Sequence, residues 1–187
     1  RDAQESRGLG DVYKRQDFLL ITGPNGGGKT SLLRTILRLQ SPTKGRISFF
    51  RQGEPVSSLD MGYLPQKNSI DSRFPITVEE VVASGLMGNT QKGNTKFDSK
   101  KEIDEMLDLM GITALRNKPI GVLSGGQLQR SLFGRALISK PEMLILDEPA
   151  SYIDRQFGNR MFEILRDLSS NGTTIMMVSH EIEPFIT

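Results

Sequence analysis

The sequence has no cysteine and no tryptophan, and only 6% of its 187 residues are aromatic. The absence of cysteine excludes disulfide bonds and thiolate metal sites. Because aromatic residues are few, the chain has few side chains that could stack on nucleic-acid bases. Its net charge of +2 does not indicate a basic surface for nucleic acid. No apolar run approaches the roughly 20 residues that cross a bilayer, and no signal-peptide pattern begins the chain. Composition therefore permits a soluble intracellular domain and no more, and we expect no nucleic-acid partner.

The length predicts one domain with a small inserted subdomain. Residues 1–16 differ from the rest, because they show neither strand alternation nor a helical stripe. We predict that 1–16 form a non-native or disordered segment, and that the folded domain occupies 17–187.

Beyond residue 17, short apolar runs alternate with helical stripes. The runs at 18–21, 143–146 and 173–178 are typical of strands buried on both faces. The segments 29–39 and 157–168, which follow the first two runs, carry apolar residues at the spacing of one helix face. Strand and helix in this order favour a mostly parallel sheet covered by helices, which is the α/β class.

A helical block from about residue 77 to 118 interrupts this alternation. Thr77 with Glu80, and Ser99 with Glu102, match the capping-box pattern that begins helices. We therefore predict two helices in this block.

Further signals complete the outline of this region. Gly111 is placed to cap the C-terminal end of the second helix, and the polar residues 87–97 predict a surface loop before it. With the helix that follows, the helical insertion is predicted to span about 77–138. Ile47, Phe49 and Phe50 indicate one more strand.

The turn after the first run carries a complete phosphate-binding pattern. G-x-x-x-x-G-K-[ST] is matched by Gly23, Pro24, Asn25, Gly26, Gly27, Gly28, Lys29 and Thr30, and Ser31 follows. Glycines let successive backbone N–H groups turn inward around an anion, and the next helix presents its positive end. Lys29 is expected to hold the β- and γ-phosphates, and Thr30 to ligate Mg²⁺. The pattern predicts a nucleoside triphosphate site over residues 23–31.

Two acidic residues and the only histidine follow other predicted strands. Asp147 and Glu148 stand at the end of one strand, where parallel sheets bind ligands. We expect Asp147 to hold Mg²⁺ and Glu148 to orient the attacking water. His180 would reach the γ-phosphate if its strand lies beside the strand of the phosphate loop. The predicted catalytic residues are Glu148, His180 and Lys29.

A second glycine-rich helix start decides the class of nucleotide-binding protein. A GTPase is excluded, because Ile120 stands where the motif Asn-Lys-x-Asp needs aspartate. Instead, Ser124, Gly125, Gly126 and Gln127 begin a helix, which is another pattern for binding anions. One nucleotide has little use for two phosphate cradles on one chain. We therefore predict that this second cradle closes over nucleotide bound to a second copy.

With these motifs in this order, residues 17–187 resemble the ATP-binding cassette of an ABC transporter. The resemblance implies a P-loop NTPase parallel-sheet core with an inserted helical subdomain, and ATP hydrolysis at a homodimer interface with ATP and Mg²⁺. It implies that Gln66 contacts Mg²⁺ and relays closure to integral-membrane permease subunits, and that 151–154 cross the dimer interface. A periplasmic or lipoprotein solute-binding protein would be an indirect partner. The chain would lie peripherally on the cytoplasmic face of the plasma membrane.

The sequence departs from that family at both ends. The family's adenine-stacking aromatic residue, first strands and closing strands are missing, so we expect a fragment truncated at both ends. Residues 73–82 are similar to a Phe-Pro-Ile-(Thr/Ser)-Val segment of cassettes that serve zinc and manganese importers. The alternatives are an importer subunit for another substrate, an ABC ATPase of DNA repair or translation, and an inert fragment.

Overall fold

The computed structural model describes residues 18–24, 26–66, 74–87 and 96–179. The strands are β1 (Phe18–Ile21), β2 (Phe49–Arg51), β3 (Glu54–Val56), β4 (Met61–Leu64), β5 (Met143–Asp147) and β6 (Thr174–Val178). The α-helices are α1 (Lys29–Ile36), α2 (Val78–Ser84), α3 (Lys96–Leu109), α4 (Gly125–Leu137) and α5 (Arg155–Ser170). Two short 3-10 helices are η2 (Thr113–Leu115) and η3 (Ile120–Val122). Residues 1–16, Asn25 and His180, on which predictions were made, lie outside the described residues.

Four strands form a parallel sheet in the order β1-β6-β5-β4. The alternation of apolar runs and helical stripes predicted this class of sheet, and the prediction is confirmed. The strand that leads into the phosphate loop pairs with β6, and β6 pairs with β5. The carboxyl ends of these three strands therefore meet at one edge of the sheet, where the predicted site residues follow them.

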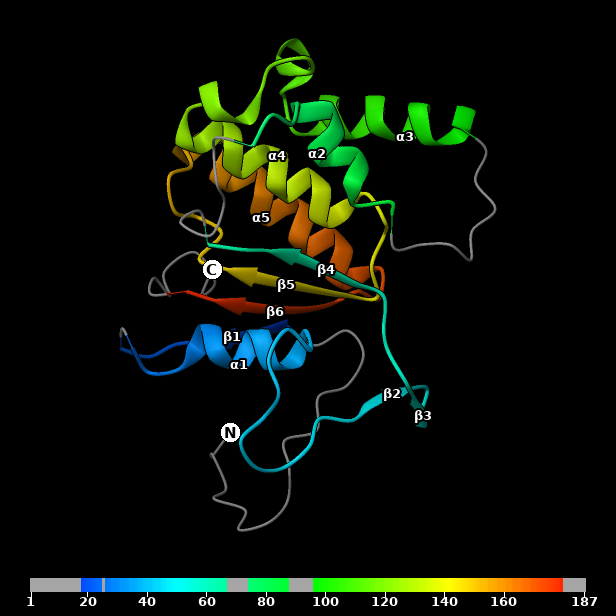
Figure 1. The fold of residues 1–187 in the computed structure, drawn as a ribbon, viewed down its shortest axis with the longest axis vertical. Helices are drawn as coiled ribbons and strands as arrows, with labels where there is room; N and C mark the ends of the chain where they lie inside the picture. Colours follow the sequence, from blue (N-terminus) through cyan, green and yellow to red (C-terminus); the bar gives the residue numbers. More distant parts are fainter. Residues whose placement is uncertain (1–17, 25, 67–73, 88–95, 180–187) are drawn as a thin grey trace.

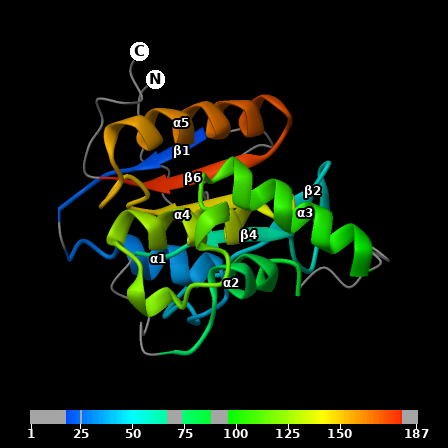
Figure 2. The same ribbon diagram turned by 90° about the horizontal axis from the view of Figure 1, so that it is seen from above.

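Different helices cover the two faces of the sheet (Figures 1 and 2). Along β5, Leu144 and Leu146 belong to the core formed with α2, α4 and α5, whereas Met143 and Ile145 pack with Leu33 of α1. This alternation arises because successive side chains of a strand point to opposite faces. All five residues of β5 are buried, as predicted.

Strand β1 and helix α1 differ from their predictions. The residues of β1 are exposed or half-buried, so burial on both faces is wrong for a strand at the edge of the sheet. Helix α1 is shorter than the predicted 29–39, because Arg38 adopts a φ of 58°, which a right-handed helix cannot accommodate. Of its apolar stripe only Leu33 is buried, while Leu32 and Leu39 are 47% and 68% exposed.

The helical block packs on the sheet face that α4 and α5 cover (Figure 1). The capping box of Thr77 and Glu80 begins α2, as predicted. Gly111 ends α3 as predicted, with a φ of 66° and a hydrogen bond from its N–H to the carbonyl of Asp108. Among the described residues, no helix is both long enough and apolar enough to cross a membrane.

The predicted second capping box is wrong. Helix α3 begins at Lys96, so Ser99 lies inside the helix and cannot be its N-cap. The predicted loop at 87–97 is shorter for the same reason, because its last two residues belong to α3, and 88–95 lie outside the described residues. The apolar spacing of this helix nevertheless holds, since Ile103 and Leu107 are buried.

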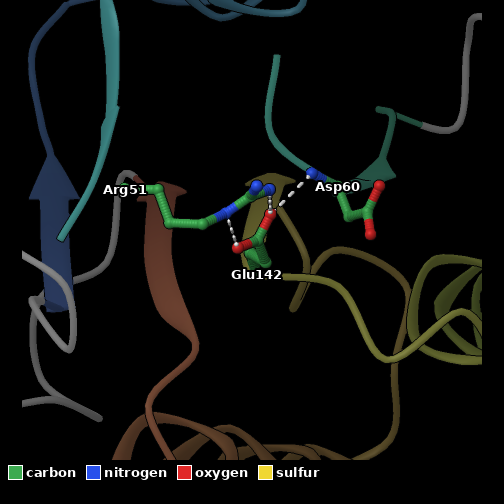
Figure 3. Close-up of polar contacts among 3 residues, drawn as sticks. All are labelled: Arg51, Asp60 and Glu142. Carbon is green, nitrogen blue, oxygen red and sulfur yellow. Dashed lines mark hydrogen bonds and ion pairs between the residues drawn. The ribbon is translucent and has the colours of Figure 1, made fainter. Parts of the chain in front are cut away.

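The hairpin of β2 and β3 lies outside the parallel sheet and is joined to it by Glu142 (Figure 3). Arg51 donates from Nε to Oε1 of Glu142 at 2.7 Å and from Nη2 to Oε2 at 2.5 Å. The N–H of Asp60 donates to the same Oε2 at 3.2 Å. One carboxylate thus links the hairpin to the starts of β4 and β5. The sequence indicates only β2 here, because Pro55 and Gly62 weaken the strand pattern of β3 and β4.

Candidate functional site

The phosphate loop connects the carboxyl end of β1 to the start of α1. Gly26 and Gly28 have φ angles of 77° and 83°, which residues with a side chain rarely adopt. Gly28 is the N-cap of α1, and among the described residues no side chain caps this helix. The first N–H groups of α1 are therefore not committed to a side-chain cap and can serve an anion.

Lys29 is the first residue of α1, and its side chain turns back over the loop. Its Nζ donates to the carbonyl oxygens of Gly23 and Pro24 at 2.7 and 2.9 Å. These bonds hold the curve of the loop and keep the positive charge beside it. An anion seated in the loop would gain a charge-assisted contact from this ammonium.

Thr30 and Asp147 meet at the base of the loop. The hydroxyl of Thr30 donates to Oδ2 of Asp147 at 3.1 Å, and Asp147 is only 1% exposed. Burial raises the pKa of this carboxyl above its usual range, and the bond from Thr30 opposes that rise. Hard oxygen ligands of this kind suit Mg²⁺, which also takes ligands from substrate phosphates. No three acidic or histidine side chains among the described residues gather at a metal site, so phosphate and water would have to complete the coordination.

Gln66 and Glu148 face each other across the same site. Nε2 of Gln66 donates to Oε2 of Glu148 at 3.0 Å. Glu148 has a φ of 51°, and its N–H donates to the carbonyl of Val178 in β6 at 2.9 Å. Such a conformation is unfavourable for a residue with a side chain, so the surrounding bonds hold Glu148 in place.

A pocket of about 260 Å³ unites these segments. It is lined by Gly26, Gly27, Gly28, Lys29, Thr30, Ser31, Gln66, Glu148 and Val178. Asp147 contacts the pocket through Thr30. His180 lies outside the described residues, although its strand β6 does pair with β1, as its predicted role requires. The pocket can hold an anion beside a lysine, a hydroxyl and a carboxylate, which are the groups that phosphoryl transfer to water needs.

The second glycine-rich segment has a different geometry. The hydroxyl of Ser124 accepts from the N–H of Gln127 at 3.3 Å, and Oε1 of Gln127 accepts from the N–H of Ser124 at 3.0 Å. These reciprocal bonds form a capping box at the start of α4. Ser124 is exposed, and Gly125, Gly126 and Gln127 are half-buried. Of the residues that line the described pocket, none comes from this segment.

The sequence gives little sign of the contacts that hold α4 against the loop 151–154. A Cβ atom on Gly126 would lie 2.9 Å from the carbonyl oxygen of Tyr152, so only glycine permits this approach. Nη2 of Arg130 pairs with Oδ2 of Asp154 at 2.5 Å. These contacts could not be predicted from the sequence, because the paired residues are far apart along the chain. The one available signal is that Gly126 and Arg130 are four residues apart and so lie on the same face of α4.

Comparisons with known proteins agree with this geometry. The family model described as ABC transporter matches residues 12–151. Over 170 residues the chain is 42% identical to a Chlamydia pneumoniae protein named "Probable metal transport system ATP-binding protein", with 89% of this chain and 69% of the relative covered. Over 172 residues it is 39% identical to the zinc uptake system ATP-binding protein ZurA of Listeria monocytogenes, with 88% and 66% covered. The chain thus spans about two thirds of the length of these relatives.

The fold has close counterparts among solved structures. A dimeric ATP-binding cassette in a post-hydrolysis state, bound to ADP and phosphate, matches with a TM-score of 0.77. The two chains are 26% identical, and the match covers 91% of this chain and 77% of the other. The parallel sheet with helices on both faces is therefore the fold of nucleotide-binding cassettes.

Proposed function

The chain belongs to the ABC transporter family, and we propose that it is the ATP-hydrolysing subunit of an importer for a metal ion, zinc or manganese. The observation that carries the proposal is the pocket in which the glycine loop, Lys29 and Thr30 meet Gln66 and Glu148. The names of two relatives, which refer to metal transport and zinc uptake, support the choice of cargo. ATP hydrolysis is the activity of this family.

The phosphate loop binds the triphosphate in this proposal. The N–H groups of 26–28 and the ammonium of Lys29 surround the β- and γ-phosphates, with Gly23, Pro24, Asn25 and Ser31 completing the loop. Water attacks the γ-phosphorus, and the bond from that phosphorus to the oxygen bridging it to the β-phosphate breaks. Because this chemistry is mostly positioning and electrostatic stabilisation, the fixed loop supplies most of what the reaction requires.

Thr30, Asp147 and Gln66 are the residues that would hold Mg²⁺. Their oxygen atoms fit its ligand preference, and the contact of Thr30 with Asp147 already places two of them together. When bound, Mg²⁺ neutralises charge on the phosphate oxygens. Nε2 of Gln66 is engaged by Glu148, which leaves its Oε1 for the ion.

Glu148 is the residue proposed to direct the attacking water. Its side chain lines the pocket and accepts a hydrogen bond from Gln66, so its carboxylate is held beside the phosphate loop. A carboxylate in this place can orient water and accept its proton. His180 is proposed to contact the γ-phosphate from the end of β6, and this role stays a prediction.

We infer that the working unit is a homodimer. Ser124, Gly125, Gly126 and Gln127 would complete the site of the second copy, because they lie away from the pocket of their own chain and Ser124 is exposed. The dimeric cassette with ADP and phosphate supports this assembly. The segment 151–154, which packs under Gly126, would lie beside the same interface.

Integral-membrane permease subunits are the proposed partners of this dimer. Phe74 and Val122 are large apolar side chains that are 63% and 68% exposed. Their segments are joined by a bond from the N–H of Ile120 to the carbonyl of Ile76 at 3.0 Å. We infer that this apolar area docks a permease, which would place the chain peripherally on the cytoplasmic face of the plasma membrane. A solute-binding protein would be an indirect partner.

The replacement Glu148→Gln tests the enzymatic proposal. We expect ATP turnover to fall by roughly 10²–10³-fold while ATP stays bound, so that an ATP-loaded dimer accumulates. Phosphate release, retention of labelled ATP and gel filtration measure these effects. Glu163→Gln is the matched control, because it removes an equal charge from an exposed site on α5. Turnover near the wild-type rate in Glu148→Gln would contradict the role of Glu148.

Metal uptake tests the cargo separately. Cells that depend on this transporter should accumulate zinc or manganese with the wild-type chain and fail to do so with Glu148→Gln, as measured by elemental analysis. ATP hydrolysis without accumulation of either metal would contradict the cargo and leave the ATPase assignment intact.

A further inference from the structure

The first turns of α4 contact the loop that follows Glu148. Gly126, Gln129 and Arg130 are spaced i, i+3 and i+4, so they share one face of the helix. That face lies against residues 149–154, through which the chain passes from Glu148 to the N-cap of α5. The helix that begins with Ser124 therefore touches the segment that carries the proposed water-directing residue.

Gln129 lies at the centre of this contact. It is 1% exposed, and its Nε2 donates to the carbonyl oxygen of Pro149, which is also buried, at 3.3 Å. Its Oε1 is buried and has no hydrogen-bond partner among the described residues. A buried amide with an unused acceptor is unfavourable for folding, although its N–H group satisfies the buried carbonyl of Pro149, which an apolar side chain could not do. The amide therefore points to a role other than packing.

The bond from Gln129 acts on the carbonyl group of Pro149, the residue that follows Glu148. The ring of Pro149 fixes φ at that residue, so the direction of its carbonyl group depends on the one remaining torsion, ψ. The hydrogen bond from Gln129 fixes that torsion. Glu148 itself is held by its N–H on Val178 and by its carbonyl, which accepts from the N–H of Ser151 at 3.2 Å. Loss of the Gln129 bond frees one side of this arrangement.

We propose that Gln129 is a positioning residue, whose amide couples α4 to Glu148 of the same chain. Glu148 is aligned for attack by water when α4 is seated on the loop 149–154. This inference rests on the proposed ATPase function. Because α4 begins with the residues proposed to meet the second copy's nucleotide, Gln129 links that encounter to hydrolysis in its own chain's pocket.

Steady-state kinetics of Gln129→Leu test the proposal. We expect kcat for Mg–ATP to fall about tenfold while KM changes less than about twofold, because the loop is displaced and the phosphate loop is not. Ser131→Ala is the matched control. Ser131 is fully buried on the same helix, but its hydroxyl donates at 2.9 Å to the carbonyl of Gln127, within α4. This control should keep kcat near the wild-type value at temperatures below the melting transitions.

Gln129→Glu supplies a readout that packing alone would not move. A carboxylate cannot donate to the Pro149 carbonyl, whereas the protonated carboxyl can do so from its O–H group. Burial raises the pKa of a carboxyl group. The ratio of the kcat of this variant to that of the wild type should therefore rise as the pH falls from about 8 to about 6. A ratio that is independent of pH and close to one would overturn the proposal.

Hydrogen exchange separates this proposal from the ATPase assignment, because it needs no turnover. Peptides that span 148–154 should exchange several times faster in Gln129→Leu than in the wild type or in Ser131→Ala. Faster exchange with the expected loss of kcat supports the proposal. Unchanged exchange, or a kcat equal to that of Ser131→Ala, overturns it. A wild-type chain that exchanges as expected but hydrolyses no ATP would contradict the proposed function instead.

Discussion

The two glycine-rich segments that begin α1 and α4 look alike in sequence and differ in structure. At α1 the N-cap is Gly28, and among the described residues no side chain bonds to the first N–H groups. At α4 the N-cap is Ser124, and its hydroxyl and the amide of Gln127 satisfy one N–H group each. The start of α1 therefore retains its capacity to bind an anion, whereas the start of α4 is already half satisfied within the chain.

This difference would let one chain carry the two helices that we propose to contact nucleotide without competition between them. The phosphate loop can surround the anion with N–H groups and an ammonium. The segment at α4 offers an exposed hydroxyl and the N–H groups of two glycines. These groups suit the proposed contact with nucleotide that is bound in the pocket of a second copy. Four substitutions test this division of roles, and their expected effects decrease in the order given.

Lys29→Ala should have the largest effect. Loss of a charge-assisted contact costs about 1.5–3 kcal/mol, which corresponds to roughly 10- to 150-fold weaker ATP binding. Lys44→Ala removes the same charge from an exposed position and should leave the affinity unchanged. Titration calorimetry measures both. Equal affinities for the two variants would show that the loop binds ATP without its lysine.

Gly126→Ala should destabilise the chain by about 1–3 kcal/mol, because the added Cβ would lie 2.9 Å from the carbonyl of Tyr152. Gly158→Ala on α5 is the matched control. Its Cβ would meet nothing within 4 Å, so the same change should stabilise the chain by about 0.5–1 kcal/mol. Urea denaturation gives both free energies of unfolding. The comparison fails if the two substitutions shift stability in the same direction.

Ser124→Ala should cost about 1 kcal/mol of stability, as expected for the loss of a capping side chain. Thr77→Ala removes the equivalent group from α2 and should cost a similar amount. Of these two variants, only Ser124→Ala should also lower ATP turnover, because Ser124 is proposed to contact nucleotide and Thr77 is not. Turnover reduced equally in both variants would make the effect a matter of stability alone.

Asp147→Asn should have the smallest effect, a modest rise in Tm at pH 7 without nucleotide or Mg²⁺. Burial raises the pKa of Asp147, so the folded chain binds this proton more tightly than the unfolded chain. The folded state therefore loses stability as the pH rises from the ordinary value of 3.8 through the raised value, and the full cost is present above it. Asparagine removes that cost and can still accept from Thr30. The rise in Tm caused by Asp147→Asn should disappear as the pH falls toward 3.8. Mg–ATP should stabilise the wild type more than the variant.

The central strands and well-capped helices were predictable from sequence because local and tertiary preferences agree there. The run at 143–146 is buried on both faces, and Ser124 begins α4. Where the two preferences diverge, the sequence misleads. The pattern of Ser99 and Glu102 fits a capping box, yet α3 begins at Lys96, three residues before Ser99. The apolar residues of β1 do not reveal that the strand lies at an edge.

The contacts inside the site were less predictable than its members. The sequence assigned Thr30 and Asp147 to one Mg²⁺ ion, and the family resemblance added Gln66 to it. Neither predicted the direct bonds of Thr30 to Asp147 and of Gln66 to Glu148, since each bond joins distant segments. Gln129 carries no distinguishing pattern of its own, because a glutamine in a helix is ordinary. Its significance arises only from burial beside Pro149.

The pairing of β1 with β6 has a consequence for the synthesis of this protein. In the register Phe18 lies opposite Ile175, so the first described strand pairs with the last described strand. At ordinary rates of translation, roughly 8 to 30 seconds separate the emergence of these two strands from the ribosome. Val178, which lines the pocket, also emerges late. The two strands that flank the phosphate loop and end in Val178 can therefore pair only after residues 22–173 between them have been synthesised.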